Sequence, residues 1–157
     1  MKFIPTASQT VGPFFSIGLA PLSQQEPEAP ESSKDKITIR GTLCDADRSP
    51  IPDALLEFWG AKEFARVPTS EDGTFVVSPV LPAAQYFDIL IFMRGLMKPV
   101  YTRLFLGERD AALSDPILKL VPSERIATLF AATDGSPNHF VWNVVMQGEN
   151  ETVFFEF

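Results

Sequence analysis

The chain has 157 residues, of which 45% are hydrophobic and 21% are charged, and this composition is typical of one globular domain with a full core. Its formal net charge of -7 argues against a nucleic-acid partner and against binding to an anionic membrane surface.

The lone cysteine, Cys44, excludes an intrachain disulfide, so nothing in the composition requires an oxidising compartment. The opening residues, MKFIPTASQTVGPFF, lack the apolar stretch of a signal peptide. The sequence also holds no apolar run of roughly 18 residues, the length that would span a membrane. We therefore expect a cytoplasmic protein.

Residues 1–20 are expected to form an N-terminal arm. A turn at Gly12-Pro13 precedes Phe14 and Phe15, two neighbouring aromatic side chains that need a surface to bury them. That surface would be the body of the domain or a neighbouring chain. Residues 21–36 are rich in Pro, Glu, Ser and Gln, which predicts an exposed connector before a folded domain at 37–157.

Period-two alternation begins at Ile37, where Ile37, Ile39 and Leu43 share one face of a half-buried strand. Short strands separated by turns are predicted after it. They cover 54–59, 74–78, the hairpin of 86–106, 139–146 and 152–157. Trp59 and Trp142 are interpreted as core residues.

The segment from Tyr86 to Leu106 is expected to be the central hairpin of the core. Ile89–Met93 is an unbroken apolar run rich in strand-favouring types, which indicates a strand buried on both faces. It ends at Arg94-Gly95, and the second strand follows after the turn. A charge at the end of a buried strand is a common position for a functional residue.

One α-helix is predicted, from Pro122 to Ala132, with Ser123 as its cap. Together these elements predict an all-β fold. It is an antiparallel β-sandwich with one short helix and an N-terminal arm, in a single domain over 1–157.

The chain alone offers little catalytic chemistry. Its only histidine, His139, and its only cysteine, Cys44, are too few for a zinc or iron site. His139 is interpreted as a strand-edge or solvent-exposed residue, and Cys44 as a small buried hydrophobe. No GxSxG nucleophile motif and no phosphate-binding glycine loop is present.

Arg94 has two interpretations. It is either a solvated strand end, paired with Asp88 or Glu108, or a clamp for an anion, because guanidinium binds a carboxylate bidentately. The turn from Thr10 to Pro13 is likewise either an anchor for the arm or part of a pocket wall.

Several segments, in this order along the chain, carry a family resemblance. They are SQTVGPFFSIGL, ITIRGTLCDADRSPIPDALLEFWGA, FMRG, YTRLFL and QGENETVFFEF. Together they resemble the intradiol ring-cleavage dioxygenase family, and within it the alpha subunits of protocatechuate 3,4-dioxygenases. The likeness covers nearly the whole chain.

The resemblance implies a β-sandwich alpha chain that pairs with a similar beta chain in a larger oligomer. In that family Fe(III), held by two Tyr and two His of the beta chain, and O2 open protocatechuate to 3-carboxy-cis,cis-muconate. The alpha chain contributes pocket wall through a Thr-x-Gly-Pro arm and the Arg of an RG turn. By motif, the substrate-binding positions here are Thr10, Gly12, Pro13 and Arg94, with no catalytic residue and no metal ligand in this chain.

The departures from the pattern agree with an iron-free chain. Gln85-Tyr86-Phe87-Asp88 stands where catalytic members place a His-x-His strand. The only tyrosines, Tyr86 and Tyr101, do not fall in segments that match the ligand tyrosines. The chain also looks shortened between Trp59 and Gly73 and around Pro79 to Gln85.

Two hypotheses follow. In the first, the chain is the non-catalytic alpha subunit of a protocatechuate 3,4-dioxygenase, with Fe(III) on its beta partner and a small aromatic acid as substrate. In the second, it is a stand-alone, self-associating β-sandwich that kept the fold and lost the reaction. A similar sandwich with His-x-His encoded nearby would favour the first.

Overall fold

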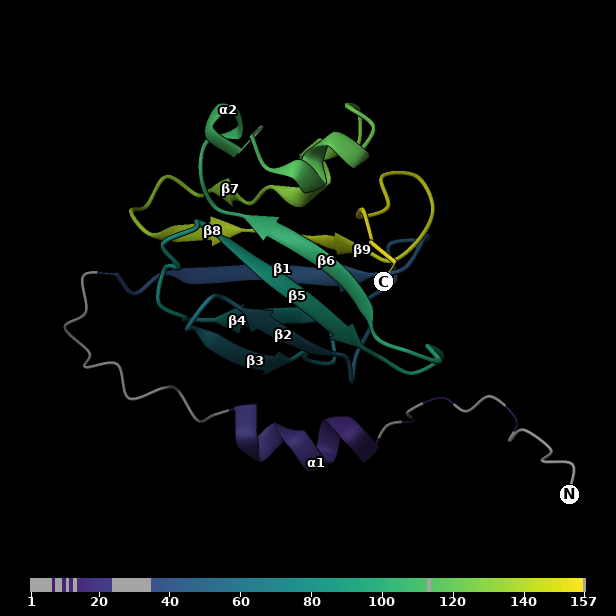
Figure 1. The fold of residues 1–157 in the computed structure, drawn as a ribbon. Coiled ribbons are helices and arrows are strands. Elements are labelled where there is room, and N and C mark those ends of the chain that lie inside the picture. The colour runs from purple at the N-terminus through teal and green to yellow at the C-terminus, as the bar shows by residue number, and fades with distance from the viewer. Residues whose placement is uncertain are drawn as a thin grey trace, which may run out of the picture.

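The computed structural model describes residues 7, 10, 12, 14–23, 35–112 and 114–156. Two sheets form its body, helix α1 lies below them and shorter helical turns lie above them (Figure 1). One sheet has the order β4-β1-β8-β7, with β9 also paired to β1, and the other has the order β3-β2-β5-β6. The predicted all-β sandwich is confirmed.

The first sheet is built around β1 (Thr38–Cys44). It pairs antiparallel with β4 (Thr74–Val77), and parallel with β8 (His139–Val141) and β9 (Val144–Val145). The short strand β7 (Ala132–Thr133) completes the sheet beside β8. This sheet is therefore mixed, not purely antiparallel.

The second sheet is antiparallel throughout. Its strands are β3 (Phe64–Pro68), β2 (Leu55–Trp59), β5 (Tyr86–Phe92) and β6 (Val100–Phe105). The predicted central hairpin is confirmed as β5–β6, in a register that pairs Asp88 with Arg103 and Leu90 with Tyr101.

The core lies between the two sheets, as the alternation of apolar residues requires. Ile37, Ile39 and Leu43 are buried on the first sheet, and Phe87, Ile89 and Ile91 on the second. Trp142 joins the same cluster, as predicted. Phe105 and Leu129 belong to a smaller cluster under the helical turns at the top.

The helical segments differ from the prediction. The predicted α-helix over 122–132 is wrong, because only the 3₁₀ turn η2 (Ile126–Leu129) forms and Phe130 is already extended. Helices α1 (Phe14–Ser23) and α2 (Arg109–Ala112) and the 3₁₀ turn η1 (Pro116–Leu120) were not predicted. Strand β3 was also missed.

Three further corrections concern strands. Trp59 is not a core residue: its side chain is 44% exposed on the outer face of β2. Strand β5 is fully buried on one face only, since Leu90 and Phe92 on the other face are partly exposed. Thr152–Phe154 is not a strand, and Phe155 forms an isolated bridge to Tyr101.

Some predictions lie outside the described residues. These are the structure of most of the arm before α1, including Pro13, of most of the connector, residues 24–34, and of Phe157. No helix among the described residues is both long and apolar enough to cross a membrane.

Candidate functional site

The turn between β5 and β6 presents Arg94. The chain leaves β5 at Phe92 and re-enters the sheet at Val100, with Arg94 and Gly95 exposed at the tip. Gly95 has a φ of 88°, a left-handed conformation that glycine adopts without strain. The sequence RG therefore places a guanidinium at the end of the central hairpin.

The N-terminal arm reaches this turn. The Gly95 N–H donates a hydrogen bond to the Thr10 Oγ1 at 3.2 Å, although the two residues are 85 positions apart. The Phe15 ring lies 6.2 Å from the Phe92 ring, which holds the start of α1 near the end of β5. Gly12 follows with a φ of 67°. The structure thus brings Thr10 to the Arg94 turn, while Pro13 lies outside the described residues.

Arg94 pairs with neither of the carboxylates suggested for it. Its Nη2 lies 3.5 Å from Oδ2 of Asp53, in the turn before β2. Asp88 instead binds Arg103, whose Nε lies 2.8 Å from Oδ1 of Asp88. The sequence analysis did not single out Asp53. Its position just before β2, the strand that pairs with β5, is the feature that places it near Arg94.

The outer face of β5 and β6 carries a second polar cluster. The Tyr101 hydroxyl donates to Asp88, and Arg103 also binds Asp115 at 2.8 Å. Burial and the hydrogen bond to Asp88 raise the pKa of Tyr101 to about 12. At neutral pH the Tyr101 hydroxyl is therefore protonated and donates a hydrogen bond to Asp88.

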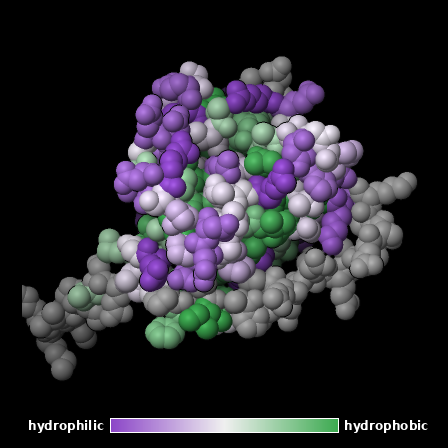
Figure 2. All heavy atoms as spheres, turned by 180° about the vertical axis from the view of Figure 1, so that it is seen from behind, coloured by the Kyte–Doolittle hydropathy of each residue, from purple (hydrophilic) through white to green (hydrophobic). Residues whose placement is uncertain are grey.

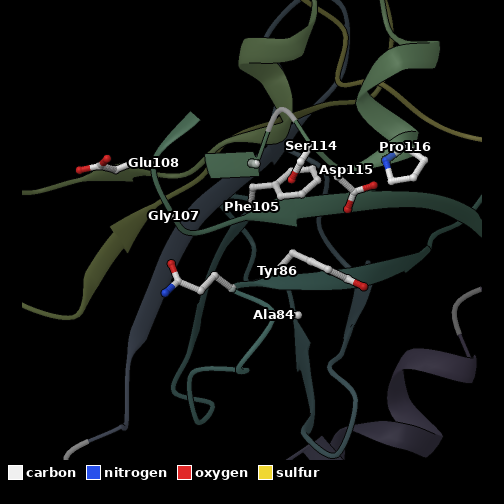
Figure 3. Close-up of a pocket in the computed structure, with 10 residues that line it drawn as sticks. Ala84, Tyr86, Phe105, Gly107, Glu108, Ser114, Asp115 and Pro116 are labelled. Carbon is white, nitrogen blue, oxygen red and sulfur yellow. The ribbon is translucent and has the colours of Figure 1, made fainter. Parts of the chain in front are cut away.

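A pocket of about 450 Å³ opens at the start of β5, at the opposite end of this strand from Arg94. Figure 3 shows Tyr86 and Phe105 on its strand side, facing Ser114, Asp115 and Pro116. Gln85 at its rim has a φ of 56°, which is uncommon for a residue with a side chain. No sequence signal pointed to this pocket.

The residues present do not fit an iron site in this chain. No group of three or more His, Cys, Asp or Glu side chains is placed to hold a metal ion within the described part of the chain. His139 is about half exposed, with its Nδ1 4.0 Å from Oδ2 of Asp134, and Cys44 is buried against the Val144 carbonyl.

Solved structures with a similar fold show which class of proteins shares the fold of this chain. The dioxygenase domain of a dioxygenase–carbohydrate-binding protein fusion from Streptomyces aligns with a TM-score of 0.59 at 16% identity, over 92% of this chain and 99% of that one. A 3-chlorocatechol 1,2-dioxygenase from Rhodococcus opacus aligns with a TM-score of 0.57 at 19% identity, over 92% and 68%. The fold is that of the intradiol dioxygenases.

Sequence comparison identifies the family to which the chain belongs among the intradiol dioxygenases. A protocatechuate 3,4-dioxygenase alpha chain from Burkholderia cepacia is 35% identical over 96% of this chain and 96% of its own length. No protein-family profile matches the chain. The chain belongs to the family of protocatechuate 3,4-dioxygenase alpha chains.

The alignment with the Burkholderia chain spans 190 positions, whereas this chain has 157 residues. The relative therefore contains segments that this chain lacks. In the structure β2 and β3 join through a tight connection in which the Gly60 N–H donates to the Glu63 carbonyl.

Proposed function

We propose that this chain is the non-catalytic alpha subunit of an Fe(III)-dependent intradiol dioxygenase that cleaves protocatechuate to 3-carboxy-cis,cis-muconate. The observation that carries the proposal is the relationship to an alpha chain over 96% of both sequences. The iron is expected on a beta partner, because the His, Cys, Asp and Glu side chains of the described residues form no group that could hold it. A cytoplasmic location belongs to the proposal and agrees with a free, buried Cys44.

The Arg94 turn would supply this chain's part of the active site. Its guanidinium is about half exposed, so a carboxylate on an aromatic ring can reach it. The hydrogen bond from Gly95 to Thr10 holds Thr10 at the same turn, which supports a place for Thr10 in the pocket wall beside the guanidinium. Thr10, Gly12, Pro13 and Arg94 are the residues that we propose bind the substrate.

The surface around this site suits a protein partner. Helix α1 has the sequence FFSIGLAPLS, which contains no charged residue, and its Phe14 and Ile17 side chains are exposed. Met97, in the same turn as Arg94, is exposed as well. Figure 2 shows hydrophobic side chains along the lower edge of the molecule, where α1 lies. Neighbouring apolar side chains exposed in this way are typical of an interface that a second chain covers.

The experiment compares two substrates in the complex with the beta chain. Arg94→Ala should raise KM for protocatechuate about tenfold or more, because a charge-assisted pair with the carboxylate is lost. Arg94→Lys should recover part of this loss, and neither variant should change KM for catechol, which has no carboxylate. An equal effect of Arg94→Ala on both substrates would remove the proposed role of Arg94.

A further inference from the structure

We propose that Asp53 is a positioning residue for Arg94: it fixes one edge of the guanidinium and leaves the rest available for the substrate carboxylate. The inference rests on the proposed function and adds a residue to it. The first observation is the strand register. Leu55 pairs with Phe92 where β2 and β5 meet, so continuing the antiparallel register places Asp53 opposite Arg94.

The second observation is the ion pair that this register allows. Nη2 of Arg94 lies 3.5 Å from Oδ2 of Asp53, and the two side chains are 55% and 51% exposed. Within the described residues, Asp53 supplies the one carboxylate found within ion-pair distance of Arg94. An unpaired arginine samples many rotamers, so a fixed anion beside it reduces the entropy lost when a second anion binds.

The third observation is the rigid base beneath Asp53. The Thr69 hydroxyl donates to the Ile51 carbonyl at 2.9 Å and accepts from the Ala54 N–H at 3.0 Å. Thr69 is buried, so these two bonds clamp the turn that contains Asp53 from both sides. The carboxylate therefore projects from a turn with little freedom to move.

Backbone conformation decides which variants test the idea. Asp53 has a φ of 59°, a conformation that Asn and Gly tolerate and that Ala does not. Asp53→Asn keeps an oxygen acceptor for the guanidinium, whereas Asp53→Gly removes the side chain without backbone strain. Both variants lose the negative charge, so the difference between them isolates the contact with Arg94.

The experiment is a mutant cycle in the complex with the beta chain. Asp53→Asn and Asp53→Gly are made in the wild-type and Arg94→Ala backgrounds, and KM and kcat are measured for protocatechuate and catechol. We expect KM for protocatechuate to be about two- to fivefold higher with Gly than with Asn, which corresponds to the loss of one polar contact with the guanidinium. The value of kcat should stay within about twofold, because the contact orients and does not react.

The difference between Gly and Asn should disappear in the Arg94→Ala background and for catechol. Equal KM values for the two Asp53 variants, or a difference that persists without Arg94, would overturn the inference and leave Asp53 as a turn residue. If Arg94→Ala itself has no selective effect on protocatechuate, the proposed role of Arg94 fails and the inference fails with it. Thermal unfolding of all variants confirms that the fold is kept.

Discussion

Charged side chains on the outer face of the β3-β2-β5-β6 sheet find hydrogen-bond and ion-pair partners within the same chain. Glu57 is only 6% exposed, and it accepts hydrogen bonds from Arg66 and from Nε1 of Trp59. Asp88 accepts from both Tyr101 and Arg103. Arg94 differs from these arginines because its one described carboxylate partner is a half-exposed aspartate, which leaves the guanidinium accessible to a ligand.

Tyr101 gives a pH prediction at the residue scale. Its pKa is raised to about 12 in the folded chain, whereas the unfolded value is near 10. Between these values the folded state keeps a proton that the unfolded state has lost, so stability falls as the pH rises from about 10 to 12. Tyr101→Phe should cost about 1 kcal/mol at pH 7, through the lost hydrogen bond to Asp88, and should remove this part of the fall.

The measurement is urea unfolding at pH 7 and at a series of values above 9. Tyr86→Phe serves as the matched control, because it removes a hydroxyl and keeps Tyr101, so the alkaline fall should persist in it. A fall of the same size in Tyr101→Phe and wild type would show that other groups cause it.

At the scale of elements, alternation of apolar residues was sufficient to predict the strands that face the core. The pattern at Ile37, Ile39 and Leu43 predicted β1, and the apolar run after Tyr86 predicted β5. The pattern did not show that the outer face of β5 is only partly covered, since burial there depends on neighbours distant in sequence. For the same reason Trp59 was placed in the core, although its ring packs outside the core against that of Phe64, with the ring centroids 4.5 Å apart and the planes tilted by 58°.

The helices were predicted least well. The apolar stripe at Ile126 and Leu129 fits an α-helix, but the chain is extended from Phe130, which lies beside Phe105. Helix α1 was missed because Gly18 and Pro21 lower the helical propensity of its segment. The position of Arg94 at the end of the apolar run was read from the sequence, and its role in binding stays a prediction. Asp53 was not singled out, because its place opposite Arg94 follows from the pairing of β2 with β5.

Strand β1 provides a prediction at this scale. A Cβ on Gly41 would lie 1.7 Å from the Trp142 carbonyl oxygen, where β8 gives way to β9. Asn143 fills that break by accepting hydrogen bonds from Thr42 through its side chain. Gly41→Ala should therefore force the strands apart and lower stability by about 3 kcal/mol.

Denaturant unfolding of the purified chain measures this cost. Gly18→Ala is the matched control, since no atom lies within 4 Å of the added Cβ and the residue is helical. This control should leave stability unchanged or slightly higher. A Gly41→Ala chain as stable as the control would mean that β1 and the Trp142 segment do not pack as described.

At the scale of the whole molecule, the exposed face of α1 is proposed to meet the partner. Ile17 on α1 is 67% exposed and Val76 on β4 is 61% exposed. Val76 therefore serves as an aliphatic control of similar exposure for a substitution of Ile17. Ile17→Glu should weaken association with the beta chain about tenfold or more, because it places a charge in an apolar interface. Val76→Glu should not weaken it.

Both substitutions alter surface residues and should change stability by less than about 0.5 kcal/mol. Association is measured by titrating each purified variant against the beta chain. Equal affinities for the two variants would remove α1 from the proposed interface.

A native mass spectrum of the tagged chain, purified from its own cells, would show whether it assembles with an iron-bearing partner, provided that the metal content of each component is determined. If this chain is an alpha subunit, it should be recovered in a complex with a second, similar chain that retains the iron after the two are separated. A complex of this chain with itself alone, or iron held by this chain, would contradict that role.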